Sequence, residues 1–423
     1  MRVQKLLLTR EGEYGTIYPS RSPQNGQDET RKKGNSNRMK RLLLLLLLLA
    51  LLIGSLQGCI HPTPEPTPES DPDTSPETEP ASPDGTYLPW VDGDTSSAAF
   101  LQGGIVDCSE REYSYDEMCE DLRALSASYG EHFSYRSFGR SADGRELYVC
   151  TLGDPNAENT ILVSAGIHGR EYLTVLLAMK QIEFYLAYYE TGNFQGAAYK
   201  DLFSRFCFYI VPMTNPDGVM LSQEGISSLR SPELRQTVEE IYLKDLQDGM
   251  TGQTEIDSYL QYWKANAKGV DLNRNFDALW EEYVSITSRP CFAQYKGLFA
   301  NSEPETRAMV ALCESLENVR AVLCLHSQGE VLYWNCGQEE SLGEETRAFT
   351  AEIANRTGYK LITEQNNDAS FSDWCALEKG WIAVTVETGL GLCPLDLDKF
   401  YPIWQDHYDL LPLAAFYFAY RAG

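Results

Sequence analysis

His168 and Glu171 lie three residues apart, directly after an apolar run at 160–165 that has the length of a β-strand. At a strand-to-helix turn, both side chains can point at one metal ion. An imidazole nitrogen and a carboxylate, completed by one further histidine, make the donor set of catalytic zinc sites that keep a fourth position for water. The pair by itself is a weak signal, because most such pairs are capped turns or surface polar residues.

A third ligand has to come from another part of the chain. The remaining histidines are His61, His132, His326 and His407. His326 directly follows the apolar run at 319–325, and the end of a buried strand is where open α/β sheets bind their ligands. His326 is therefore the best-placed third ligand, and the alternative is a core histidine whose ring nitrogens are satisfied by neighbouring groups.

An arginine in the segment 270–276, Val-Asp-Leu-Asn-Arg-Asn-Phe, could bind an anionic group. The guanidinium of Arg274 offers a two-pronged donor to a carboxylate, and the amide of Asn273 could add a further donor. Since the formal charge of the chain is −26, an inward-facing arginine would be a selective anchor. The alternative is a surface ion pair, which contributes little to stability.

These residues need a scaffold that brings strand ends together, and the hydrophobic pattern predicts one. Apolar residues at helical spacing predict a helix over 115–129, and a longer helical stretch covers 172–189. Short apolar runs predict strands at 147–152, 160–165, 206–211, 319–325 and 382–386. Because several of these runs are continuously apolar, we expect an α/β fold whose sheet is covered by helices on both faces.

Two more helices are expected toward the end of the chain. Residues 304–316 have helical spacing, and Ser302-Glu303-Pro304-Glu305 has the pattern of a capping box with proline in the first turn. The last helix, over 404–420, is aromatic on one face and should pack on the sheet. We find no internal repeat, and residues 113–421 are predicted to form a single α/β domain.

The composition excludes several classes of protein. The 423 residues are 43% apolar and 11% aromatic, which rules out wholesale disorder. The chain has 35 Lys and Arg against 61 Asp and Glu, so it lacks the basic character of a nucleic-acid-binding protein. The cysteines after Cys59 form no C-x-x-C pair, which gives no support for a cysteine zinc knuckle, and their spacing leaves any disulfide pairing open.

Residues 39–59 are predicted to be a secretory signal of the lipoprotein type. Met39-Lys40-Arg41 precede an apolar stretch at 42–56, which is short against the about 20 residues of a membrane span. The ending Leu56-Gln57-Gly58-Cys59 resembles a bacterial lipobox, in which the cysteine is lipidated. The alternative is an uncleaved signal anchor. Residues 1–38 are unpatterned, and our hypothesis is that translation starts at Met39.

Residues 60–100 are predicted to be a disordered linker. Eight of the twenty prolines fall between residues 62 and 83, interleaved with Thr, Ser, Glu and Asp. Such a segment cannot bury a core and favours an extended polyproline II conformation of ~3.1 Å per residue. We therefore expect an exported domain on a stalk, held by a lipid anchor on Cys59 at the outer face of the bacterial cytoplasmic membrane.

Over roughly residues 113–420 the chain resembles the M14 zinc carboxypeptidases. Seven motifs occur in the order of that family: Phe138-Gly139-Arg140-Ser141 with Gly144-Arg145, His168-x-x-Glu171, Asn215-Pro216-Asp217-Gly218, Trp263-Lys264-Ala265-Asn266 with Asp271-Leu272-Asn273-Arg274-Asn275, Ser302-Glu303-Pro304-Glu305-Thr306, His326-Ser327 and Thr385-Val386-Glu387. Each motif is weak alone, but their shared order is specific. The resemblance implies a mixed, mostly parallel sheet flanked by helices, with one zinc ion per chain.

The resemblance also implies roles for the matching residues. The implied zinc ligands are His168, Glu171 and His326. The implied substrate-binding residues are Asn273 and Arg274, which would bind a terminal carboxylate, and Arg170, which would contact the substrate further along. Glu387 would be the general base and then the acid, and Lys264 would stabilise the oxyanion of the tetrahedral intermediate.

The chain departs from the animal digestive members of the family at three positions. Lys264 stands where those enzymes have an arginine, so it keeps the charge but loses the planar fork. An ungapped count back from Asp373-Trp374 places Gln365 where those enzymes have a mobile, substrate-capping tyrosine. The same count places Ser372 at the specificity position, which predicts neither an apolar nor a basic pocket.

The chain also resembles bacterial M14 members that cut the stem peptides of peptidoglycan between γ-D-glutamate and a diamino acid. The motifs that carry this resemblance are Trp263-Lys264-Ala265-Asn266, His326-Ser327-Gln328-Gly329-Glu330 followed by Tyr333-Trp334, and Val386-Glu387-Thr388-Gly389. The expected substrate is thus a peptide with a free carboxylate, and a wall stem peptide in particular. One alternative is a zinc-dependent deacylase of small acylated amino acids, which would not need the Asn273–Arg274 anchor. Another is a catalytically silent cell-surface binding protein on the same fold. The sequence gives no signal of oligomeric state.

Overall fold

The structure is a computed structural model that describes residues 97–422. The upstream segment 1–38, the signal sequence 39–59 with Cys59, and linker residues 60–96 lie outside the described residues. Within residues 97–422, none of the helices combines the length and the apolar character needed to cross a membrane.

A sheet of eight strands forms the centre of the described chain, in the order β1-β2-β6-β3-β7-β10-β8-β9. The strands are β1 (Phe133–Arg140), β2 (Glu146–Gly153), β3 (Asn159–Ser164), β6 (Phe206–Val211), β7 (Val319–His326), β8 (Val331–Tyr333), β9 (Lys360–Leu361) and β10 (Ile382–Glu387). The neighbours β6, β3, β7 and β10 run parallel, while β1, β2 and β8 pair antiparallel with their inner neighbours. The predicted mixed, mostly parallel sheet is therefore confirmed.

The central strands are buried on both faces, as their continuous apolar runs predict. In β3, Ile161 and Val163 face one hydrophobic core, and Leu162 between them faces the other. In β7, Leu323 and Cys324 divide in the same way. Since successive side chains of a strand point to opposite faces, each central strand contributes to two cores and needs cover on both sides.

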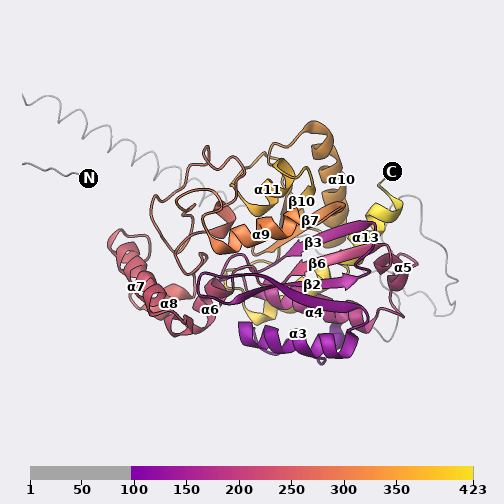
Figure 1. The fold of residues 1–423 in the computed structure, drawn as a ribbon, viewed down its shortest axis with the longest axis horizontal. Helices are drawn as coiled ribbons and strands as arrows, with labels where there is room; N and C mark the ends of the chain where they lie inside the picture. The colour runs from indigo at the N-terminus through magenta and orange to yellow at the C-terminus, as the bar shows by residue number, and fades with distance from the viewer. Residues whose placement is uncertain (1–96, 423) are drawn as a thin grey trace, which may run out of the picture. The chain divides into compact units, whose positions relative to one another are not determined.

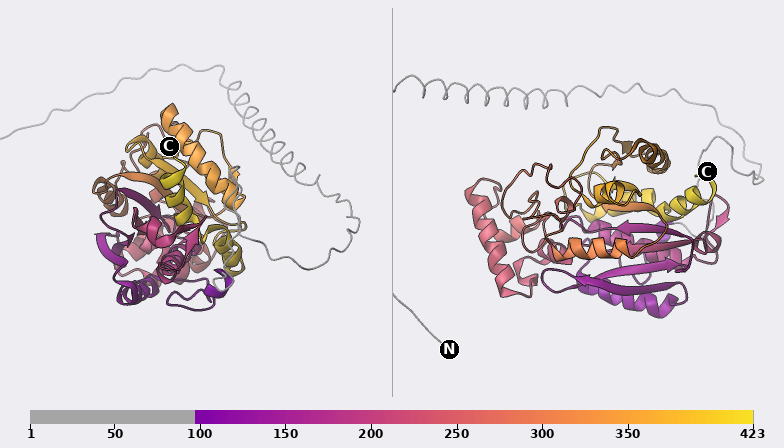
Figure 2. Two further views of the ribbon diagram at one scale, coloured as in Figure 1. Left: turned by 90° about the vertical axis from the view of Figure 1, so that its right-hand side faces the viewer. Right: turned by 45° about the horizontal axis from the view of Figure 1, so that its top comes forward.

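Helices supply that cover. The longer helices are α3 (Tyr115–Tyr129), α4 (Leu173–Ala187), α6 (Pro216–Glu224), α7 (Pro232–Gln247), α9 (Pro304–Glu314), α10 (Glu340–Thr357), α12 (Phe400–His407) and α13 (Leu410–Tyr420). The shorter elements are α2 (Ser97–Phe100), α5 (Tyr199–Phe203), α8 (Ile256–Leu260), α11 (Phe371–Leu377), β4 (Asn193–Phe194) and β5 (Ala197–Ala198). Figure 1 shows α9 and α11 on one face of the sheet and α3 and α4 on the other. Both Figure 1 and Figure 2 place α7 beyond one end of the strands and α13 near the other.

The hydrophobic pattern predicts the strands β2, β3, β6, β7 and β10 and the helices α3, α4 and α9, whereas other elements, among them β1, α7 and α10, were not predicted. Two of the helix predictions need correction. The helix predicted over 115–129 has those bounds in the structure, and Ser114 caps it. The single helix predicted over 404–420 is wrong, because the chain forms α12 and α13 with a break between them. Pro412 lies in the first turn of α13 and could not continue a helix from α12, since it lacks an N–H and its ring would clash with the preceding turn.

The predicted capping box at the start of α9 is also wrong. Pro304 begins the helix as expected, but the N-cap is Glu303, whose side chain makes no capping hydrogen bond. The Glu303 carboxylate is engaged elsewhere, because it accepts a hydrogen bond from Asn266 Nδ2 at 2.9 Å and lies 3.3 Å from Lys268 Nζ.

A long irregular segment between α8 and α9 carries three of the predicted site residues. Hydrogen bonds between distant parts of the segment hold it in place. Lys264 N donates to Phe292 O at 2.9 Å, and Asp271 N donates to Tyr295 O at 2.8 Å. Farther along the segment, Asn275 Nδ2 donates to the carbonyl of Lys296 at 2.8 Å. Apart from a single 3₁₀ turn at Leu272–Arg274, the segment is therefore fixed by such hydrogen bonds and not by regular secondary structure.

The cysteines of the described chain are thiols without disulfides, at positions 108, 119, 150, 207, 291, 313, 324, 336, 375 and 393. Cys150, Cys207 and Cys324 are buried in apolar surroundings, as expected from their sequence context. They act as small hydrophobic core residues.

Candidate metal centre and active site

His168, Glu171 and His326 come together at one edge of the sheet. His168 and Glu171 follow β3, and His326 is the last residue of β7, the parallel neighbour of β3. Parallel neighbours end at the same edge, so the ligand atoms of the three residues lie within 4.8 Å of one another. His168 Nδ1 is 2.8 Å from Glu171 Oε1, and His326 Nδ1 is 3.0 Å from Glu171 Oε2.

The donor set of this triad fits zinc. All three side chains are buried, and two imidazole nitrogens with one carboxylate form a zinc site that leaves a position for water. Burial acts to raise the pKa of Glu171, but the two imidazoles and Lys264 hold that pKa well below its ordinary value. Glu171 is therefore an ionised ligand in the pH range where zinc binds imidazole.

The other described histidines lie elsewhere. His132 stacks on the ring of Tyr189, with 3.7 Å between ring centroids. His407 is buried, and its Nδ1 lies 2.7 Å from the carbonyl oxygen of Ile403. Burial lowers the pKa of His407 to about 4, so the side chain is neutral and structural.

Asp271 is a member of the centre that the sequence-based prediction missed. Its Oδ1 lies 3.2 Å from His168 Nε2, the ring nitrogen that faces away from Glu171. Burial acts to raise the pKa of Asp271, but His168 and Lys264 hold it far below its ordinary value. A carboxylate behind a ligating histidine fixes the ring orientation and tautomer. The sequence feature that could have identified Asp271 is its position two residues before Asn273, within the same short motif.

Glu387 lies beside the triad as the last residue of β10. β10 runs parallel to β7, and the register aligns Glu387 with His326. Burial raises the pKa of Glu387 to about 7; His326 opposes this shift and the Glu171 carboxylate adds to it. A carboxylate with a pKa near neutrality can both accept and return a proton.

Lys264 places a cationic group beside the triad. Its Nζ is 3.8 Å from Glu171 Oε1, and its side chain is only 14% exposed. The backbone of Lys264 is held against the loop that carries His168 and Glu171, because Gly169 N donates a hydrogen bond to Lys264 O at 3.1 Å. The lysine thus supplies a positive charge at the edge of the centre, where its position suits stabilisation of an oxyanion.

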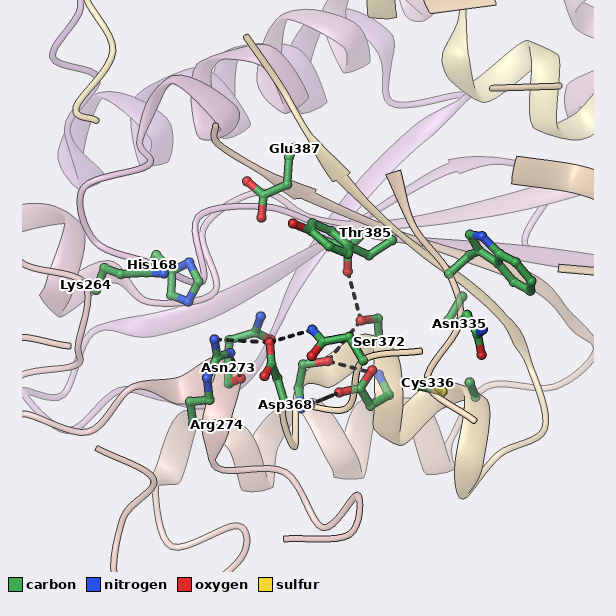
Figure 3. Close-up of a pocket in the computed structure, with 17 residues that line it drawn as sticks. His168, Lys264, Asn273, Arg274, Asn335, Cys336, Asp368, Ser372, Thr385 and Glu387 are labelled. Carbon is green, nitrogen blue, oxygen red and sulfur yellow. Dashed lines mark hydrogen bonds and ion pairs between the residues drawn. The ribbon is translucent and has the colours of Figure 1, made fainter. Parts of the chain in front are cut away.

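Asn273 and Arg274 also reach the centre from the irregular segment. Asn273 Nδ2 is 3.5 Å from His326 Nε2, and its Oδ1 accepts a hydrogen bond from Phe371 N at 3.0 Å. Arg274 is not on the open surface: its side chain is 12% exposed and lines a cavity next to His168 and Glu387. Figure 3 shows Arg274 and Glu387 on different sides of this cavity.

Arg170 lies between the two ligands in sequence but does not line that cavity. Its backbone carbonyl accepts a hydrogen bond from Cys393 Sγ at 3.2 Å. Its buried Nε has no hydrogen-bond partner among residues 97–422. A contact between Arg170 and a substrate therefore stays a prediction.

The cavity beside Arg274 has a volume of about 190 Å³ and is mainly polar. Ser372, at the predicted specificity position, lies in its wall with its Oγ 2.9 Å from Thr385 Oγ1. Gln365 does not line the cavity, but Tyr333 from β8 does. Tyr333 pairs across the strands with Thr385, and the residue is 38% exposed. A tyrosine thus lines the cavity from an element that the sequence-based count did not consider.

The chain matches a known family and several known proteins. The family model described as zinc carboxypeptidase, Peptidase M14, matches residues 118–391. The chain is 29% identical over 299 residues to "Gamma-D-glutamyl-L-diamino acid endopeptidase 1" of Lysinibacillus sphaericus, covering 70% of each chain. It is 30% identical over 290 residues to "Uncharacterized protein YqgT" of Bacillus subtilis, covering 67% of this chain and 72% of that protein.

Solved structures share the fold. Thrombin activatable fibrinolysis inhibitor superposes with a TM-score of 0.58 at 18% identity, over 75% of this chain and 78% of its own. Carboxypeptidase A from Helicoverpa armigera superposes with a TM-score of 0.53 at 17% identity, over 77% of this chain and 79% of its own. The match of the family model over residues 118–391, together with the 30% identical relative and the buried His-Glu-His triad, shows that the chain belongs to the M14 family of zinc carboxypeptidases and is a zinc-dependent metallopeptidase.

Proposed function

We propose that this enzyme hydrolyses the bond between γ-D-glutamate and a diamino acid in the stem peptides of peptidoglycan. The observation that supports this proposal most directly is the position of Arg274, which lines a polar cavity together with Glu387 and His168. A guanidinium there can bind the free carboxylate of the residue on the leaving side of the scissile bond. The name of the Lysinibacillus relative supports the stem peptide as the substrate class.

The residues around the triad can each take part in the reaction. His168, Glu171 and His326 would hold the zinc ion, which would supply Lewis-acid activation of a water molecule near neutral pH. Glu387 accepts a proton from the attacking water and then donates a proton to the leaving amine. Lys264 stabilises the negative charge that develops on the substrate's carbonyl oxygen.

Substrate orientation comes from the opposite wall of the cavity. Arg274 and Asn273 hold the carboxylate of the leaving residue, so the scissile carbonyl is placed next to the triad. In Arg274, Nη1 donates to Asn273 O at 2.7 Å and Nε donates to Tyr283 OH at 3.0 Å. These contacts fix the guanidinium before substrate arrives, which reduces the entropic cost of binding.

Defined substrates test this proposal. The purified full chain, loaded with zinc, is incubated with four kinds of substrate: the stem peptide L-Ala-γ-D-Glu-L-Lys, its diaminopimelate counterpart, ordinary peptides that end in a free carboxylate, and N-acyl amino acids. The products are identified by mass. We expect release of the diamino acid and loss of activity with a zinc chelator. Cleavage of ordinary peptides alone contradicts the wall substrate, and hydrolysis of N-acyl amino acids alone favours the deacylase alternative.

We also propose that the enzyme is exported and anchored through Cys59. The pattern of residues 39–59 and the proline-rich stretch that follows support this location. Metabolic labelling with a fatty acid, on the wild-type chain and on Cys59→Ala, provides the test. Label in the wild type alone is expected, and equal label in both chains contradicts the anchor.

A further inference from the structure

We propose that Asp368 determines specificity by binding an ammonium group on the side chain of the leaving residue. This assignment rests on the proposed function and names the residue that would recognise the side chain of the diamino acid. Asp368 lies in the wall of the same cavity, with its Oδ2 3.3 Å from Arg274 Nη2. Figure 3 shows the two side chains next to each other, on the far side of the cavity from Glu387.

The charge balance at Arg274 leads to this assignment. The substrate's carboxylate must share the guanidinium with Asp368, and two carboxylates at one cation repel each other. If the leaving residue carries only a carboxylate, one negative charge in the cavity stays uncompensated. A leaving residue with an additional ammonium group restores the balance, because its carboxylate meets Arg274 and its ammonium meets Asp368.

Asp368 is held so that one of its oxygens is free for a ligand. Its backbone N donates to Asp373 Oδ2 at 2.8 Å, and Asn366 Nδ2 donates to Asp368 Oδ2 at 3.0 Å. Within residues 97–422, no hydrogen-bond donor meets Asp368 Oδ1, and the side chain is 32% exposed. A fixed carboxylate with an open oxygen in a polar cavity is a suitable partner for an ammonium group.

The other acidic residues of the cavity wall are less suited to this task. Asp373 is occupied by structural contacts, since its Oδ2 accepts hydrogen bonds from Asp368 N and Ser370 N. Glu387 lies next to the triad, where the proposed chemistry requires it. Ser372, at the position expected to set specificity, has no charge. Asp368 is therefore the carboxylate available to the leaving side chain.

Two substrates that differ in one charge test the proposal. One is L-Ala-γ-D-Glu-L-Lys, and the other is the same peptide acetylated on the lysine side chain. We expect the zinc-loaded wild type to prefer the ammonium peptide in kcat/KM by about tenfold to a hundredfold. In Asp368→Asn this preference should fall to near one, mainly through a higher KM for the ammonium peptide.

The matched control is Asp396→Asn. It removes one carboxylate that is also paired with an arginine, Arg111 at 3.2 Å, but that lies outside the cavity and is 81% exposed. The substrate preference of this variant should equal that of the wild type. Equal melting temperatures of the two variants show that Asp368→Asn is folded.

Three outcomes overturn the role of Asp368. The first is a wild type with no preference for the ammonium peptide, and the second is an Asp368→Asn variant that keeps the preference. The third is an Asp368→Asn variant that cleaves both peptides more slowly by the same factor. The last result makes Asp368 a positioning residue for Arg274. If the wild type cleaves neither peptide, the proposed function has failed, and calorimetric binding of both peptides to zinc-loaded Glu387→Gln, with and without Asp368→Asn, decides the role of Asp368 separately. Equal affinity for the two peptides then contradicts it.

Discussion

At the scale of single residues, the centre depends on how each charged group is held by a second one. His168 lies between Glu171 and Asp271, and Glu171 lies between two imidazoles and Lys264. Such contacts fix both the protonation state and the direction of each side chain before metal or substrate binds. Single substitutions should therefore separate metal binding from catalysis.

Replacing Glu387 by glutamine should abolish most activity while leaving the metal site intact. The amide cannot accept the proton of the attacking water, and loss of a general base lowers kcat by about a hundredfold to ten-thousandfold. Zinc content by atomic emission should stay near one ion per chain, because Glu387 is not among the triad ligands. The control is Glu317→Gln, an exposed glutamate. Near-normal kcat in Glu387→Gln would contradict its role as the base.

Replacing Asp271 by asparagine should weaken zinc binding. The amide cannot provide the carboxylate that orients His168, and loss of such a partner lowers metal affinity by about tenfold to a hundredfold. Competition with a chromogenic zinc chelator measures the change. Asp277→Asn, at an exposed position, is the control. An unchanged zinc affinity would show that Asp271 contributes only to the packing of the segment.

At the scale of elements, the N-terminal cap of the short helix α11 helps to determine the shape of the cavity. Ser370 Oγ accepts a hydrogen bond from Asp373 N at 3.1 Å, and Asp373 Oδ2 accepts one from Ser370 N at 3.1 Å. Asp373 Oδ2 also holds the backbone of Asp368. The cap of α11 thus positions the loop that carries Asp368.

Ser370→Ala and Ser114→Ala form a matched pair of cap deletions, because both serines head a capping box. Each deletion should lower the free energy of unfolding by about 1 kcal/mol. Only Ser370→Ala should also raise KM, since α3 lies on the face of the sheet away from α11. Urea unfolding and steady-state kinetics on both variants provide the measurements. A KM that rises equally in both variants would show a general loss of stability instead.

At the scale of the whole molecule, the interior contains charged residues whose protonation affects global stability. Glu305 is fully buried at the start of α9, where it accepts hydrogen bonds from Ala142 N at 2.7 Å and Asn266 Nδ2 at 3.2 Å. Burial raises the pKa of Glu305 to about 7 from an ordinary value of 4.5, and the Asp217 carboxylate adds to this shift. Between these values the folded chain binds more protons than the unfolded chain.

Glu305 should therefore make the enzyme less stable as the pH rises from about 4.5 to about 7. The stabilisation that Glu305 contributes through its raised pKa is complete below about pH 4.5 and is lost above about pH 7. It amounts to about 3 kcal/mol in the free energy of unfolding. Urea unfolding of the wild type and of Glu305→Gln, both with chelator at pH 5 and pH 8, isolates it. The stability of the wild type relative to the variant should fall between the two pH values. Glu239→Gln, at an exposed position, should show no such change.

Much of the fold was predictable because its signals are local. The helix α3 and the strands β6, β7 and β10 follow from hydrophobic runs whose meaning depends on neighbouring residues only. Short strands such as β8 and β9 were not predicted, because they have too few residues to show a period. The break before α13 was missed although Pro412 marks it, since the aromatic pattern continues across it.

The sequence by itself determined which residue types stand at the ends of the strands, and hence that zinc chemistry was available. Only the tertiary structure decided that His326 meets Glu171, a contact between residues 155 positions apart. That contact depends on β3 and β7 being parallel neighbours, which a hydrophobic run does not encode. Asp271, Tyr333 and Asp368 joined the site for the same reason. Side chains from separate segments become neighbours only when the order of strands and the path of the irregular segment are fixed.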